Sequence, residues 1–231
     1  MLAAAVATAR STYLYWLPCK GSMLRGSVIH GYANVGPKFS RACKRAMDGD
    51  VSLVVPWTSE LNLVAMALLG VAWLTLVLGL RWQLRTKVVA ALPGLATLAF
   101  ALAGAAAIGD PKPLEYTPPL GGLVVIMELF AVVALLWIAA WQREVRGRYI
   151  LRLAVVLWGT TAFSFAHLMT EYYIWMIFLS RSDSPPGYGY LIFATITISA
   201  ILIVIMTLRA PTSRAEDEPH QNHNSGSLTL A

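Results

Sequence analysis

Long apolar stretches alternate with short polar ones along most of the chain. Five of the apolar stretches are long enough to cross a bilayer as a helix that rises by about 1.5 Å per residue. They cover residues 61–80, 88–108, 121–141, 153–179 and 190–208. The pattern predicts an all-α integral membrane protein in which residues 48–209 form a bundle of five transmembrane helices.

The composition supports this class. Of the 231 residues, 57% are hydrophobic and 13% are charged, whereas roughly a quarter of the residues of a soluble domain are charged. The formal net charge is +6. In a membrane protein an excess of Lys and Arg marks the loops that stay in the cytoplasm. We therefore expect the lipid bilayer, and no nucleic acid, as a partner.

Basic side chains mark every second predicted loop. They are Arg81, Arg85 and Lys87 after the first stretch, Arg143, Arg146, Arg148 and Arg152 after the third, and Arg209 and Arg214 after the fifth. The two other loops carry almost no net positive charge. The positive-inside rule then places the N-terminus outside and the C-terminus inside. Beyond the fifth stretch, the polar residues 210–231 are expected to form a disordered tail.

Residues 1–47 form a basic N-terminal extension that differs from the rest of the chain. Seven basic residues precede the first acidic one, Asp48, and no long apolar run occurs. Three interpretations stay open: a mis-annotated start with Met47 as the initiator, an organelle transit peptide, or a disordered basic tail. A basic extension outside the membrane conflicts with the positive-inside rule, and a start at Met47 removes that conflict.

The two cysteines, Cys19 and Cys43, both lie in this extension and not in the predicted bundle. They are too far apart in the sequence for a CxxC redox or metal pair. We therefore expect no disulfide framework and no thiolate metal site in the bundle.

Polar residues recur inside the fourth apolar stretch. Thr160, Ser164, His167 and Glu171 follow one another at steps of four, three and four residues. On a continuous helix over 153–179 they form one stripe. Lipid does not tolerate such a stripe, so we expect it to face other helices, a cofactor or a water-filled cavity.

Three ionisable residues fall inside the predicted spans: Glu128, His167 and Glu171. Counted from the outer surface, Glu128 lies about 10 Å deep, Glu171 about 12 Å and His167 about 18 Å. Thr195 and Ser199 on the fifth helix lie about 8 Å and about 14 Å deep on the same count. The neighbouring depths make a polar cluster between the third, fourth and fifth helices the candidate site.

This cluster is compatible with several kinds of chemistry. His167, Glu171 and Glu128 are side chains that bind Zn, Fe, Mn or Cu. They also suit a proton relay or hydrogen bonding to a quinone. Alternatively, they form interhelical hydrogen bonds that hold the bundle together. Haem would need a Met or a partner's histidine as its second axial ligand, because His167 is the only histidine in the five spans.

Motifs of nucleotide binding, zinc proteolysis and serine hydrolysis do not occur in the sequence. The small size, the odd number of spans and the lack of a strong catalytic motif favour a small polytopic membrane protein that acts as a non-catalytic or accessory subunit of a larger respiratory or transport complex. The alternatives are a small proton-coupled carrier and a membrane metal- or quinone-binding enzyme, each using the Glu/His/Glu cluster. The identity of any cofactor stays unknown at this stage.

The expected partners are other membrane subunits or further copies of the chain in a homo-oligomer. The expected location is a bacterial inner membrane. If residues 1–47 are a transit peptide, it is instead the inner membrane of an organelle.

Overall fold

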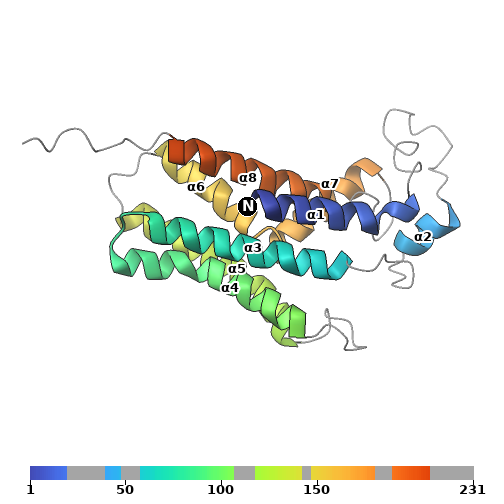
Figure 1. The fold of residues 1–231 in the computed structure, drawn as a ribbon, viewed down its shortest axis with the longest axis horizontal. Coiled ribbons are helices and arrows are strands. Elements are labelled where there is room, and N and C mark those ends of the chain that lie inside the picture. Colours follow the sequence, from blue (N-terminus) through green and yellow to red (C-terminus); the bar gives the residue numbers. More distant parts are fainter. Residues whose placement is uncertain (20–39, 48–57, 107–117, 142–146, 180–188, 209–231) are drawn as a thin grey trace, which may run out of the picture.

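The computed structural model describes residues 1–19, 40–47, 58–106, 118–141, 147–179 and 189–208. Within these ranges the chain is helical and contains no strand (Figure 1). The helices are α1 (Leu2–Tyr15), α2 (Arg41–Met47), α3 (Thr58–Gly79), α4 (Leu84–Ala106), α5 (Pro118–Trp141), α6 (Gly147–Thr160), α7 (Phe165–Leu179) and α8 (Tyr190–Leu208), with a short 3-10 turn η1 (Leu17–Cys19) after α1. The predicted tail, residues 210–231, lies outside the described residues.

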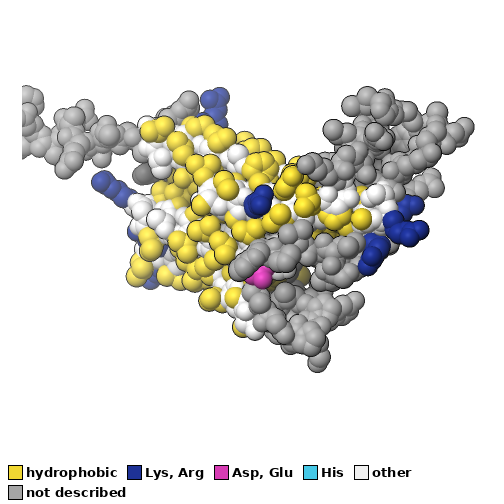
Figure 2. Space-filling model, turned by 45° about the vertical axis from the view of Figure 1, so that its right-hand side comes forward, with side chains coloured by type: hydrophobic (Ala, Val, Ile, Leu, Met, Phe, Trp, Pro, Cys, Tyr) yellow, Lys and Arg dark blue, Asp and Glu magenta, His cyan; other side chains and the backbone are white. Residues whose placement is uncertain are grey.

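Within the part of the chain that the structure describes, three helices are long and apolar enough to cross a membrane: α3, α4 and α8. A fourth span is added if the bent pair α6 and α7 is counted as one. Large hydrophobic side chains on these helices point outward; Leu78 and Leu102 are each 70% exposed. Figure 2 shows hydrophobic side chains over most of the described middle of one face, with Lys and Arg mainly toward the ends. The all-helical class is therefore confirmed over the described residues, with three candidate membrane-spanning helices.

The fourth apolar stretch is not one helix, and the prediction of a continuous helix over 153–179 is wrong. Its two halves, Gly147–Thr160 and Phe165–Ile174, meet at 87°. At the break the amide of Ser164 donates to the carbonyl of Thr161 at 2.9 Å, which closes a tight turn. Hydropathy alone does not reveal the break because residues on both sides of it are apolar, while Ser and Thr offer the backbone alternatives to the helical ladder.

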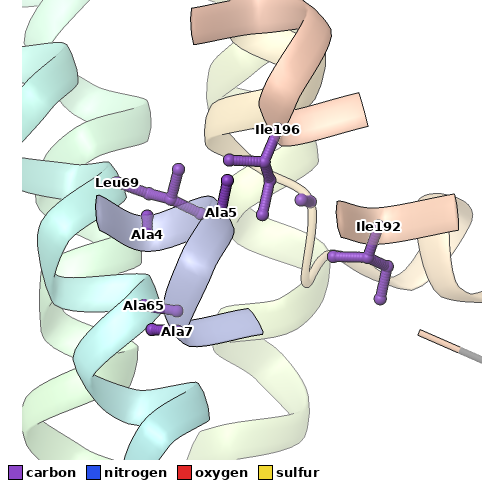
Figure 3. Packing of buried hydrophobic residues seen from close by; sticks show 8 residues of the cluster. Ala4, Ala5, Ala7, Ala65, Leu69, Ile192 and Ile196 are labelled. Carbon is purple, nitrogen blue, oxygen red and sulfur yellow. The ribbon is translucent and has the colours of Figure 1, made fainter. Parts of the chain in front are cut away.

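Helix α1 was not predicted, and it packs between α3 and α8. Its small residues Ala4, Ala5 and Ala7 contact Leu69 of α3 and Ile196 of α8 (Figure 3). Ala65, Ile192 and Ala162 belong to the same buried cluster. Small side chains let helices approach closely. Because Ala162 lies in the α6–α7 break, α1 also covers part of that break.

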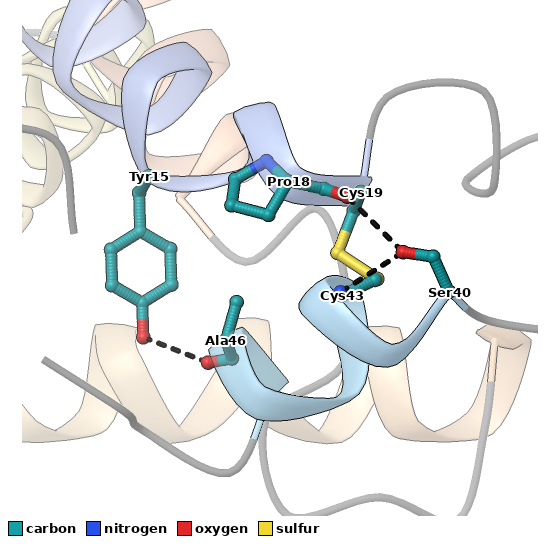
Figure 4. The surroundings of a disulfide bond; sticks show 6 residues. All are labelled: Tyr15, Pro18, Cys19, Ser40, Cys43 and Ala46. Carbon is teal, nitrogen blue, oxygen red and sulfur yellow. Dashed lines mark hydrogen bonds between the residues drawn. A yellow bond between two sulfur atoms is a disulfide. The ribbon is translucent and has the colours of Figure 1, made fainter. Parts of the chain in front are cut away.

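A disulfide between Cys19 and Cys43 joins the end of α1 to α2 (Figure 4). Ser40 caps α2, since its hydroxyl oxygen accepts the amide of Cys43 at 3.1 Å, and it donates to the carbonyl of Pro18 at 3.4 Å. The sequence analysis did not predict this pairing, which lies outside the transmembrane bundle as defined above. The three interpretations of residues 1–47 given above stay predictions.

The two ends of the bundle are defined by contacts. At the disulfide end, the Ser11 hydroxyl of α1 donates to the carbonyl of Thr58 at 2.9 Å, and Tyr190 packs against the cluster of Trp16 and the two cysteines. The disulfide end therefore holds the end of α1 and the starts of α3 and α8. The opposite end, called the basic end below, holds the last turns of α3 and α8 and the first turns of α6.

Helices α3 and α4 approach closely through two glycines. A Cβ atom on Gly70 would lie 2.9 Å from the carbonyl oxygen of Gly94. One turn away, the indole nitrogen of Trp73 donates to the carbonyl of Ala90 at 2.6 Å, across the same interface. A proline at position 93 of α4 leaves carbonyls without an intrahelical donor, and close packing with cross-helix bonds compensates for such losses in lipid.

Candidate functional site

Glu171 lies on α7, is 0% exposed, and binds the start of α8. One carboxylate oxygen, Oε1, accepts the amides of Gly189 at 2.6 Å and Leu191 at 2.8 Å. These are among the first amides of α8, which lack partners inside that helix. A negative charge at a helix N-terminus is also favoured by the helix dipole. Glu171 is thus an N-terminal cap supplied by a neighbouring helix.

The backbone at this cap requires glycine. Gly189 has φ +105°, a conformation that costs residues with a Cβ atom. A Cβ atom there would also lie 2.6 Å from the hydroxyl of Thr12 on α1. The start of α8 is therefore held by Glu171 on one side and covered by α1 on the other.

Glu128 plays the same part for α7. It lies on α5, and its Oε1 accepts the amide of Ala166, the second residue of α7. The side chain is partly buried. The break at residues 161–164 creates a helix start inside the apolar segment, and a backbone start without partners is costly there. The Glu128 carboxylate satisfies one of the exposed amides.

His167 lies in the first turn of α7 and is 2% exposed. Its ring is 5.0 Å from that of Trp158 on α6, centroid to centroid, and is tilted by 41°. Neither ring nitrogen has a hydrogen-bond partner among the residues that the structure describes. A buried imidazole without a partner is uncommon, and no hydrogen bond among the described residues explains the burial of His167.

The hydroxyl residues of the predicted cluster have separate local roles. Thr160 donates to the carbonyl of Val156, and Thr195 to that of Leu191, both at 2.9 Å and four residues back on their own helices. Ser199 of α8 donates to the carbonyl of Val155 on α6 at 2.8 Å. Ser164 is 2% exposed and ends the break at the start of α7.

The structure therefore divides the predicted cluster. Glu128 of α5 binds the start of α7, where His167 lies, whereas Glu171 lies a turn further along α7 and binds the start of α8. Thr160 lies before the break, so the four-residue stripe does not run along one helix. Among the described residues, no group of three or more His, Cys, Asp or Glu side chains is gathered as a metal site would need. Two of the proposed metal ligands, Glu128 and Glu171, therefore bind the starts of different helices.

A second site was missed by the sequence analysis. A cavity of about 690 Å³ lies at the basic end between α3, α6 and α8. Tyr149 and Arg152 line it, together with apolar residues of the other two helices. Arg152 had been counted only as a loop charge that reports orientation. The spacing of three residues between Tyr149 and Arg152 was the available signal, because it places both on one face of a helix.

Comparison of the chain with protein-family models, with curated proteins and with solved structures found no match.

Proposed function

We propose that the protein is a five-pass membrane protein, with its N-terminus outside and its C-terminus inside, that serves as a non-catalytic or accessory subunit of a larger membrane complex. Helix α5 supplies the third pass and the bent pair α6–α7 the fourth. The alternation of basic loops along the sequence supports the orientation and favours a bacterial inner membrane as the location.

One observation carries the proposal of a non-catalytic role. Both glutamates inside the apolar segments accept backbone amides at a helix start: Glu128 at α7, and Glu171 at α8. Carboxylates engaged in this way stabilise the bundle, and their burial needs no catalytic explanation. The hydroxyl groups of Thr160, Thr195 and Ser199 likewise bond to backbone carbonyls.

Variants of Glu171 test this proposal. In an accessory subunit, both Glu171→Gln and Glu171→Ala lower the amount of protein and of its assembled complex in the membrane. Glu171→Ala has the larger effect, because Gln keeps one acceptor oxygen. Quantitative immunoblots of denaturing and native gels measure both amounts. A Glu171→Gln protein that accumulates and assembles normally, yet abolishes pH-driven uptake in whole cells, would contradict the proposal.

A proton-coupled carrier is the second candidate, and a specific feature favours it. Transporters place discontinuous helices at their substrate sites, and His167 lies at the start of α7, beside the α6–α7 break, with no bonded partner among the described residues. Proteoliposomes loaded with a pH-sensitive dye measure proton entry. If the protein is a carrier, protons enter vesicles that hold the wild type, and His167→Gln abolishes this proton entry. Impermeable wild-type vesicles would exclude it.

A further inference from the structure

The cavity at the basic end has an amphipathic lining. Leu76 of α3 and Ile203 and Met206 of α8 form its apolar part. Tyr149 and Arg152 of α6, whose side chains carry a phenol and a guanidinium, line the same space. At about 690 Å³ it is comparable with cavities that take small molecules, which span roughly 300–1,000 Å³.

The polar side of the cavity is positively charged. Arg152 is partly buried and forms no ion pair with another residue that the structure describes. It lies five residues into α6, which starts at Gly147. The first turns of a helix also carry the positive end of its dipole. An anion that binds here therefore meets a guanidinium, a phenol hydroxyl and a helix start, and the described residues that line the cavity include no carboxylate.

The position of the cavity matches the depth of lipid headgroups. Five residues of helix rise by about 7.5 Å, so Arg152 lies just below the basic end of the bundle. The apolar part of the cavity lies on the last turns of α3 and α8, beside hydrophobic side chains such as Leu78, which is 70% exposed. Basic cavities between transmembrane helices at this level bind anionic headgroups.

We propose that this cavity binds one anionic phospholipid of the surrounding leaflet. The phosphate lies against Arg152 and the Tyr149 hydroxyl, and part of an acyl chain lies against Leu76, Ile203 and Met206. A charged guanidinium donates two parallel hydrogen bonds to a phosphate, and the net negative charge of the lipid balances the positive charge of Arg152. The proposal holds for an accessory subunit and for a carrier alike.

Two substitutions on the same helix separate this site from general surface charge. Arg152→Gln removes the guanidinium from the cavity. Arg148→Gln is the matched control, because Arg148 lies one turn earlier on α6, is exposed, and does not line the cavity. Both changes remove one positive charge. Arg152→Lys keeps the charge and serves as a second variant if Arg152→Gln does not fold.

The experiment titrates the delipidated full-length protein with phosphatidylglycerol or phosphatidylcholine of identical acyl chains, and counts bound lipids by native mass spectrometry. The wild type is expected to bind one phosphatidylglycerol about tenfold more tightly than phosphatidylcholine. Arg152→Gln should reduce this preference to near unity, Arg152→Lys should retain most of it, and Arg148→Gln should leave it unchanged.

Four results would overturn the proposal. The first is equal binding of the two lipids by the wild type. The second is an equal loss in Arg148→Gln and Arg152→Gln, which would show general surface charge. The third is displacement of the lipid by millimolar inorganic phosphate alone, which would show a free-anion site. The fourth is a neutral isoprenoid or another copy of the chain in the cavity of the wild type.

Discussion

Glu171 is a carboxylate with no exposed surface inside an apolar segment, and its contacts explain how it is tolerated. It accepts two amides at the start of α8 at 2.6 and 2.8 Å. Glu128 does the same for one amide at the start of α7. Each glutamate removes the penalty of a helix start that lies where water is scarce. The burial of the two glutamate carboxyl groups is thus a consequence of where α7 and α8 begin.

We predict that Glu171→Ala destabilises the protein by about 2–3 kcal/mol, because it leaves two amides of α8 without an acceptor. Glu171→Gln should cost less, since an amide oxygen still accepts. Unfolding titrations in mixed micelles measure the difference. Equal stability of the wild type and Glu171→Ala would show that water or lipid satisfies these amides.

A second residue-scale prediction concerns the contact between α6 and α8. A Cβ atom on Gly159 would lie 2.1 Å from the Ser199 hydroxyl oxygen and 2.6 Å from its Cβ. Gly159→Ala should therefore destabilise the bundle by about 1–3 kcal/mol. Gly122→Ala is the matched control, because nothing lies within 4 Å of its added methyl group.

The double variant Gly159→Ala/Ser199→Gly tests the cause. It removes the atoms of Ser199 that the new methyl group meets, so it should recover part of the lost stability in the same unfolding titration. If Gly159→Ala has no effect on its own, the close approach of α6 and α8 is absent in the membrane.

At the scale of elements, the sequence predicted some helices well and missed others for physical reasons. The predicted helix over residues 190–208 coincides with α8. Its apolar run is unbroken and has polar flanks, so the pattern indicates a single helix with clear ends. The break at 161–164 was missed, because its stabilisation comes from Glu128 on another helix. Helix α1 was missed because its buried residues are mostly Ala, Ser and Thr, which form no long apolar run. Contacts made far along the chain do not appear in a local pattern.

The docking of α1 can be tested with two neighbouring residues. Ala5 is 3% exposed and packs in the cluster with α3 and α8, whereas Val6 is 68% exposed. Ala5→Phe should lower the thermal midpoint of the purified protein, because the ring does not fit between the helices, and Val6→Phe should not. If both variants behave like the wild type, α1 does not pack between α3 and α8 in the membrane.

The candidate site was predicted in part at this scale. Depth counting placed Glu128, Glu171 and His167 at neighbouring levels; in the structure Glu128 of α5 binds the start of α7, where His167 lies, whereas Glu171 binds the start of α8. The same count treated 153–179 as one straight helix, so it could not separate Glu171 and Thr160 from that pair. The cavity beside Arg152 was missed because it forms between three helices whose relative positions a hydropathy pattern does not specify.

At the scale of the whole molecule, the two ends of the bundle differ. One end carries the Cys19–Cys43 disulfide, and disulfides persist in oxidising compartments. The other end carries the basic side chains Arg81, Arg85 and Lys87. The disulfide agrees with the proposed orientation, in which the basic end faces the cytoplasm. Arg41, Lys44 and Arg45 of α2 nevertheless place basic side chains at the disulfide end as well.

Cysteine labelling tests this orientation. A cysteine placed at Gln83, an exposed position between α3 and α4, should react with a membrane-impermeant maleimide only after the membrane is opened. A cysteine at Ser59, exposed at the start of α3, should react in intact cells. The reverse pattern would invert the proposed topology.

We propose that the chain works as a subunit of a larger assembly. Native mass spectrometry of the full-length protein, released from its own membrane together with surrounding lipid, tests this proposal. We expect a complex of fixed stoichiometry that contains other membrane proteins, with Glu171→Gln reducing its abundance. A chain that is released only by itself, or only with copies of itself, would overturn the proposal and favour the carrier.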